Sequence, residues 1–145
     1  MIQSAIDRLR ELCQTLPAAL SKIPDEAFKA KPLAHKWSKQ EVMGHLIDSA
    51  TNNHHRFVRA QFENTPSIWY PQDNWNAGNF YQSLDKQHII NFWLIYNQHI
   101  LAIVERLSAE QLELKCRCGG EEIYTLDFLI NDYVQHIDHH LKQVT

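Results

Sequence analysis

The chain has 145 residues, of which 44% are hydrophobic and 21% charged, and its formal net charge is −3. This composition is typical of a globular protein, and it argues against a disordered chain and against a basic protein that tracks nucleic-acid phosphates. No apolar run is long enough to cross a membrane, and three cysteines are too few for a disulfide framework. We therefore expect a single domain over residues 1–145, located in the cytoplasm, with neither nucleic acid nor membrane as a partner.

The first half of the chain predicts two long helices. Apolar residues recur at helical spacing over residues 2–15, which predicts a helix that ends near Pro17. Residues 23–36 contain two prolines and are expected to form a connection that can include a short helical turn. Ser38 and Glu41 then have the spacing of a capping box, in which each side chain bonds the other residue's backbone N–H. A second helix is predicted over roughly 38–61.

The second half predicts a loop, two more helices and a hairpin. Residues 62–80 are rich in aromatic residues and asparagine and show no periodicity, which indicates a long loop of the kind that often carries function. A third helix is predicted over roughly 82–106, and a small hairpin is predicted around Gly119 and Gly120. Thr125 is expected to cap a last helix over roughly 126–143. Four long helices predict an all-α helical bundle.

Nine histidines are an unusually high number for this length. On the last helix His136 and His140 lie at one edge of the apolar arc, whereas His139 falls on the solvent side. A pair at i and i+4 places two imidazoles where they can chelate one metal, although a polar rim at a packed seam gives the same pattern. Ile137 follows His136, so the helix does not carry the His-Glu-x-x-His motif of metalloproteases.

The second helix carries a polar stripe beside its apolar face, made of His45, Ser49, Asn52 and Arg56. Such a stripe suits the wall of a pocket, and a solvated surface is the alternative. A catalytic metal site needs a third protein ligand, for which His45 is the best candidate and His99 on the third helix is its rival. His54 and His55 are expected to be exposed.

These motifs resemble the DinB superfamily. The residues that carry the resemblance are Trp37-Ser38-x-x-Glu41-Val42-x-x-His45-Leu46-x-Asp48-Ser49, with Pro66 to Trp75 and Gln135 to Leu141. The resemblance is closest to the YfiT-like branch, which includes the bacillithiol S-transferases. It implies a DinB-like four-helix bundle with a long loop between the second and third helices and a small hairpin before the last. It also implies a homodimer and one divalent metal per chain, zinc or nickel, held by His45, His136 and His140.

The expected activity is metal-dependent transfer of a low-molecular-weight thiol to an electrophilic substrate. Arg56 is expected to pair with a carboxylate, Asn52 to donate a hydrogen bond, and Asp48 to orient His45. Trp69, Tyr70 and Trp75 are expected to close the pocket. A metal-dependent hydrolase is the alternative, weakened because no carboxylate stands out as the base. A non-catalytic dimeric scaffold is the third hypothesis, and it predicts a fourth protein ligand such as His99.

Overall fold

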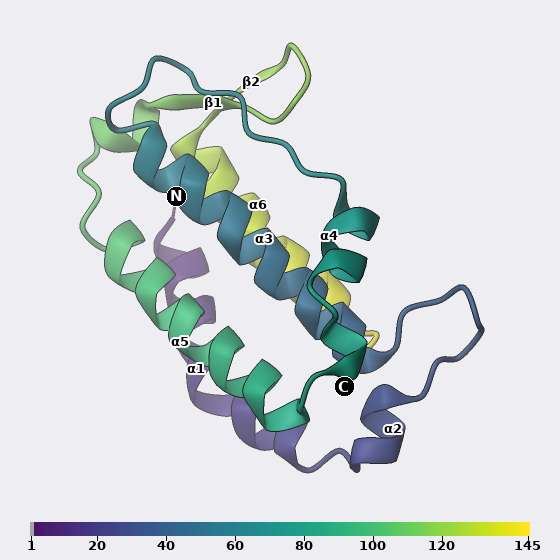
Figure 1. Ribbon diagram of the computed structural model, residues 1–145. Coiled ribbons are helices and arrows are strands. Elements are labelled where there is room, and N and C mark those ends of the chain that lie inside the picture. The colour runs from purple at the N-terminus through teal and green to yellow at the C-terminus, as the bar shows by residue number, and fades with distance from the viewer. Residues whose placement is uncertain (1) are drawn as a thin grey trace.

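Four long helices dominate the computed structural model, which describes residues 2–145 (Figure 1). They are α1 (Gln3–Ser21), α3 (Lys39–Arg59), α5 (Lys86–Val104) and α6 (Leu126–Leu141). The shorter elements are α2 (Asp25–Lys29), α4 (Gln72–Gly78), the 3-10 helices η1 (Tyr81–Ser83) and η2 (Gln111–Glu113), and the strands β1 (Lys115–Arg117) and β2 (Ile123–Thr125). None of the helices in this part of the chain is both long and apolar enough to cross a membrane.

The long helices form a closed ring in which each packs against two others. α1 packs against α5 and α6, and α3 completes the ring by packing against the same two helices. α3 and α5 run in the same direction, so the chain between them returns along the outside of the bundle (Figure 1). The apolar faces meet in one core, with Leu9, Leu46, Trp93 and Ile137 among its fully buried members. The four-helix bundle predicted from the sequence is confirmed.

The predicted caps set the starts of two helices. Ser38 Oγ accepts from the backbone N–H of Glu41 at 3.1 Å, and the Ser38 N–H donates to Glu41 Oε1 at 3.0 Å. Thr125 accepts from the N–H of Phe128 and starts α6 directly after the hairpin, whose strands β1 and β2 pair antiparallel. The third long helix begins at Lys86 rather than near residue 82, because the Asp85 side chain caps it there.

The first helix does not end near Pro17 as predicted, but continues to Ser21 with Pro17 inside it. Pro17 has no N–H to donate to the preceding turn, which weakens a helix locally. However, Leu16 and Leu20 extend the apolar stripe by one turn and are both buried in the core. Burial of a leucine stabilises by about 1.5–3 kcal/mol, so tertiary packing offsets the local break.

The predicted loop over residues 62–80 contains a helix, α4, that the sequence did not reveal. Most of its residues (Asp, Trp, Gly and two Asn) are weak helix formers, and tertiary hydrogen bonds help to hold it in place. Asn76 donates to the carbonyl of Glu41 at 2.8 Å, and Gln40 donates to the carbonyls of Tyr81 and Leu84 at 2.6 and 2.7 Å. The segment between α3 and α5 (residues 60–85), called the crossover below, is therefore held against the first half of α3 by hydrogen bonds.

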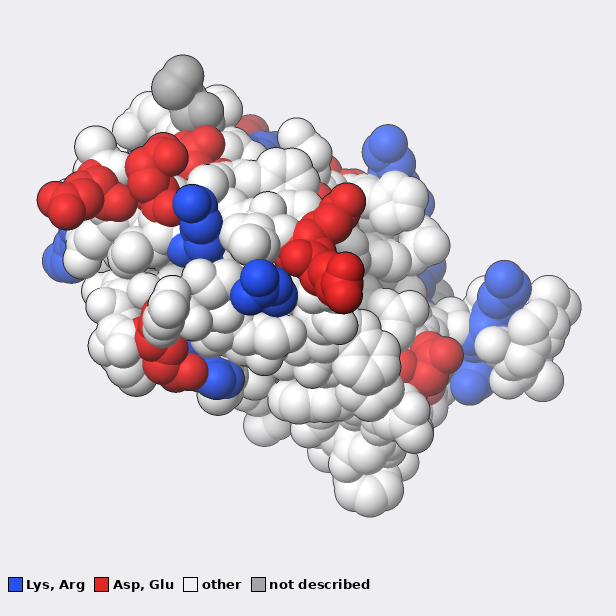
Figure 2. All heavy atoms as spheres, turned by 90° about the horizontal axis from the view of Figure 1, so that it is seen from above, with Lys and Arg blue, Asp and Glu red and all other residues white. Residues whose placement is uncertain are grey.

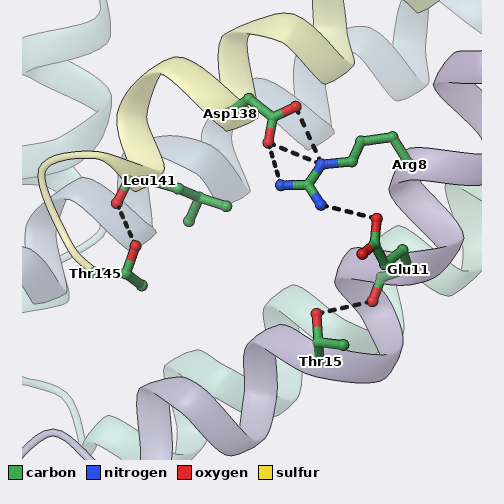
Figure 3. Close-up of polar contacts among 6 residues, drawn as sticks. All are labelled: Arg8, Glu11, Thr15, Asp138, Leu141 and Thr145. Carbon is green, nitrogen blue, oxygen red and sulfur yellow. Dashed lines mark hydrogen bonds and ion pairs between the residues drawn. The ribbon is translucent and has the colours of Figure 1, made fainter.

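An ion pair joins the first helix to the last (Figure 3). Arg8 donates through Nη2 and Nε to the Asp138 carboxylate at 2.8 and 3.1 Å, and its Nη1 also pairs with Glu11. Both side chains of the α1–α6 pair are about two-fifths exposed, so the pair contributes little stability of its own. The pair shows how α6 is turned: Asp138 faces α1, whereas His136 and His140 face α3.

Candidate metal centre

Three imidazoles converge between α3 and α6. His45 comes from the second turn of α3, and His136 and His140 come from successive turns of α6. The Nε2 atoms of His45 and His136 are 3.2 Å apart, and each residue offers one nitrogen within 4.8 Å of the others. Within residues 2–145 this is the only cluster of three or more histidine, cysteine or carboxylate groups with such spacing.

The distances fit a metal ion. Metal–nitrogen bonds of about 2.0–2.1 Å place tetrahedral ligands about 3.3 Å apart and octahedral neighbours about 2.9 Å apart. The 3.2 Å between the Nε2 atoms of His45 and His136 lies between these values. Nitrogen donors suit zinc and nickel, and no cysteine or carboxylate within the described residues joins the three imidazoles. Such a set leaves coordination positions open, as catalytic sites require.

The second ring nitrogens orient two of the three imidazoles. His140 Nδ1 lies 2.9 Å from Oε1 of Gln143, to which it can donate, so its Nε2 is left free for a ligand. His136 Nδ1 lies 3.5 Å from Ser49 Oγ, a longer contact of the same kind. His45 Nδ1 is buried and has no hydrogen-bond partner among residues 2–145. This pattern directs Nε2 atoms, rather than Nδ1 atoms, toward the centre.

Burial keeps two of the imidazoles unprotonated, the state that binds a metal ion. Only 1% of His45 is exposed, and burial together with the nearby His136 and His140 lowers the pKa of His45 to about 3. Burial, followed by the proximity of His140 and His139, lowers the pKa of His136 to about 4. Both imidazoles are neutral at pH 7, and only neutral imidazoles bind metal.

A cavity of about 640 Å³ opens beside the triad, and His140 and Gln143 form part of its wall. The rest of the wall comes from α2, the segment between α2 and α3, the first turn of α3 and the first turn of α4. Trp37 also lines the cavity, and its ring lies over His45 with the ring centres 5.0 Å apart. A small molecule in this cavity therefore lies next to His140 and next to Trp37, which packs against His45.

Asp48 does not orient His45 as predicted, since no hydrogen bond reaches His45 Nδ1. Asp48 Oδ1 instead accepts from the Tyr81 hydroxyl at 2.6 Å and from Asn79 at 3.0 Å. Burial raises the pKa of the Asp48 carboxyl to about 6, and the Tyr81 hydrogen bond opposes this change. Gly44 makes the arrangement possible, because a Cβ at this position would lie only 2.2 Å from the Tyr81 ring. Asp48 thus fastens the crossover to the helix that carries His45.

The four predicted substrate-binding residues do not line this cavity; they are Asn52, Arg56, Tyr70 and Trp75. Asn52 donates to the carbonyl of Asp48 within its own helix. Arg56 is buried and donates to the Ile68 carbonyl at 2.8 Å, so it holds the start of the crossover against α3. Tyr70 and Trp75 pack against each other edge to face. Trp69 is 66% exposed and does not close the cavity either.

None of the other histidines in residues 2–145 belongs to the cluster of three, although the ring of His139 lies 5.1 Å from that of His140 and His35 lines the cavity. His139 and His55 are exposed, as predicted. His99 is exposed on α5 and packs against His54, with their ring centres 5.3 Å apart, so it is no rival to His45. His54 is half-buried, contrary to prediction, because its Nδ1 lies 2.8 Å from the hydroxyl of Tyr96. No fourth ligand of the kind expected for a closed scaffold site is found within residues 2–145.

Sequence reasoning missed most of the cavity wall, including Lys36, Lys39, Asp73 and Gln143. One signal was present: residues 27–40 contain four lysines and a histidine but no acidic residue. Asp73 belongs to the unpredicted α4 and reaches the cavity only through the folding of the crossover. Gln143 follows His140 by three residues, which is one helical turn.

The fold and the site together define the class of the protein: a four-helix bundle with a long crossover and a cluster of three histidines, spaced as metal ligands, between two of its helices. Residues 5–144 match the DinB superfamily, and the chain belongs to this superfamily. Among curated proteins it is 25% identical over 142 residues to the "Putative metal-dependent hydrolase YfiT" of Bacillus subtilis strain 168, covering 97% of this chain and 80% of that protein. The solved structure of YfiT from Bacillus subtilis, described as "a probable metal-dependent hydrolase with an unusual four-helix bundle topology", matches with a TM-score of 0.87 and 24% identity. That match covers 97% of this chain and 82% of the other.

Proposed function

We propose that His45, His136 and His140 bind one divalent metal, zinc or nickel, and that the chain is a metal-dependent hydrolase of a small molecule. The observation that carries this proposal is the placement of three imidazoles, within 4.8 Å of one another, beside a cavity of about 640 Å³. Cavities of about 300–1,000 Å³ suit small-molecule ligands. The name of the relative YfiT supports the same class of reaction.

The residues around the cavity have distinct roles in this proposal. A divalent metal held by three imidazoles keeps coordination positions open and lowers the pKa of a water or a thiol bound there. Gln143 holds the ring of His140 in place through Nδ1. Trp37 covers His45 and excludes water from that side. Asp73 is the carboxylate in the cavity wall, and it would be the base for the attacking water.

Thiol transfer is the second candidate, favoured by the composition of the ligand set. Within residues 2–145 the cluster contains three imidazoles and no carboxylate, so a bound divalent ion would keep its full charge of +2. That charge would favour the thiolate form of a bound thiol. In that case the thiolate attacks an electrophilic carbon of the second substrate, and the leaving group departs with the bonding electrons. The proton of the thiol would pass to solvent when the thiolate forms, so the attack itself would not need Asp73 as a base.

Elemental analysis of the purified protein tests the metal site. We expect one divalent metal per chain, lost in His45→Ala, His136→Ala and His140→Ala. His139→Ala and His99→Ala are the matched controls and are expected to retain the metal, because both side chains are exposed and neither belongs to the cluster of three. Equal metal loss in His139→Ala, or full retention in His45→Ala, contradicts the assignment.

Two assays separate the two reactions. Metal-dependent hydrolysis of a panel of esters and amides, slowed in Asp73→Asn at unchanged metal content, supports the hydrolase. A thiolate-to-metal absorption band in the cobalt-substituted protein, with metal-dependent consumption of a thiol and an electrophile, supports the transferase. A protein that holds metal but is inactive in both assays contradicts both proposals.

A further inference from the structure

The cavity beside the triad has a strongly basic wall. Its basic and aromatic lining residues are Lys31, His35, Lys36, Trp37, Lys39 and His140. Asp73 is its single carboxylate, so its lysines outnumber its acids three to one. The chain as a whole carries a formal charge of −3, and the face seen from above shows acidic and basic side chains interspersed (Figure 2). The excess of positive charge is thus a local property of this cavity.

Two of the three lysines have no acidic partner. Lys31 lies 3.4 Å from Glu41, whose carboxylate also closes the cap of α3. Lys36 and Lys39 form no ion pair with any carboxylate in residues 2–145. Two unpaired ammonium groups in one concave wall attract an anion, because their charges add and no carboxylate of the described residues pairs with either.

Lys39 occupies a position where a cation is unfavourable for the helix itself. It is the first residue of α3, next to the N-terminal end, where the helix dipole is positive and acidic residues are preferred. Lys36 lies three residues earlier and adds to the same positive potential. The positive end of α3 and the two lysines therefore act in the same direction on a ligand in the cavity.

We propose that the cavity recognises a substrate by an anionic group, a carboxylate or a phosphate, bound by Lys36 and Lys39. The inference rests on the proposed function, because it takes the cavity as the place where the substrate lies. Trp37 lies between the lysines and the histidines. It lines the cavity with the lysines, and its ring centre lies 5.0 Å from that of His45. A ligand whose anionic end contacts the lysines thus has its other end within reach of His140, the triad imidazole that lines the same cavity.

Titration of the full-length protein with small anions tests this proposal directly. Succinate and inorganic phosphate are the two anionic probes, and succinamide is the uncharged analogue of succinate. Binding is followed by calorimetry and by tryptophan fluorescence, with Trp37→Phe identifying the signal of the cavity. We expect binding of at least one anion, weakened by added salt, and none of succinamide. Tighter binding of phosphate indicates a phosphate ester as the anionic group, and tighter binding of succinate indicates a carboxylic acid.

The double variant Lys36→Gln/Lys39→Gln is expected to weaken anion binding by about tenfold or more. Lys22→Gln/Lys115→Gln is the matched control, since both lysines are exposed and lie outside the cavity wall. It removes the same charge and is expected to leave the affinity within about twofold. Equal weakening in both double variants shows unspecific attraction and overturns the proposal.

Repeating the titrations after chelator treatment separates this proposal from the one on the metal. Anion binding that persists without metal and depends on Lys36 and Lys39 supports the anion site even if the triad proves inactive. Anion binding that disappears on chelation and is insensitive to the lysine variants places the anion on the metal, which overturns the inference and leaves the metal site intact.

Discussion

The metal-free protein is expected to lose stability between pH 8 and pH 5, because two of its histidines are neutral when folded. The pKa values of His45 and His136 are lowered from 6.5 to about 3 and about 4 by burial. Unfolding returns both groups to water, where their pKa is about 6.5. Below that pH the unfolded chain binds more protons than the folded one, so stability is full above pH 6.5 and falls as the pH falls.

The size of the loss follows from these pKa values. At pH 5 each of the two histidines lowers the free energy of unfolding by about 2 kcal/mol relative to pH 8. Asp48 acts in the opposite direction, since its pKa is raised to about 6 and the folded state takes up its proton first. That proton uptake raises the free energy of unfolding by about 1 kcal/mol at pH 5. The net loss is about 2–3 kcal/mol, a large fraction of the stability of an ordinary domain.

Urea unfolding of the chelator-treated protein at pH 8 and pH 5, followed by circular dichroism, measures this loss. His136→Gln is expected to reduce it by about 2 kcal/mol, whereas His55→Gln, which changes an exposed histidine, leaves it unchanged. Zinc-loaded protein is expected to resist acid further, since bound metal holds the imidazoles neutral. A pH dependence that is the same in His136→Gln as in the unaltered chain refutes the reasoning.

Two further predictions concern single side chains. Gln143→Ala is expected to weaken metal affinity by about 10–100-fold, measured by competition with a chromogenic chelator, because it frees the ring of His140. Gln135→Ala, at an exposed position on the same helix, is the control, and equal effects of the two contradict the role of Gln143. Gly44→Ala is expected to lower the free energy of unfolding by about 1–3 kcal/mol, because its Cβ overlaps a buried tyrosine ring. Gly78→Ala has no atom within 4 Å of its new Cβ, so a loss as large as that in Gly44→Ala argues against the packing explanation.

The parts of the fold that were predictable are those encoded in local patterns. Helical periodicity and the caps at Ser38 and Thr125 predicted the long helices and the starts of two of them. The i, i+4 spacing of His136 and His140 predicted that they share a face, and the polar stripe on α3 pointed to His45 as their neighbour. Each of these predictions needs only the geometry of one helix. The homodimer stays a prediction of the family resemblance.

The parts that were not predictable depend on contacts between distant segments. α4 exists because buried amides of α3 and the crossover bind carbonyls across the interface, which no local propensity reveals. Arg56 shares the stripe of His45, but the crossover covers it, so a helix face alone could not tell cavity from interface. Asp48 likewise bonds Tyr81, a residue 33 positions away, rather than its neighbour His45. The cavity itself joins four segments and has no sequence signature.

The two sides of the candidate site differ in how firmly the backbone holds them. α3 packs against α5, α6 and α4, and most of the residues around His45 are buried, so its amides are expected to exchange slowly with solvent. Residues 30–36 on the opposite side are all exposed, and the bond from the Lys36 N–H to the Leu33 carbonyl is the only backbone hydrogen bond that ends within that segment. These amides are expected to exchange early. A rigid side that holds the imidazoles and an adaptable side that carries the lysines would make the protein tolerant of substrate shape while remaining strict about substrate charge.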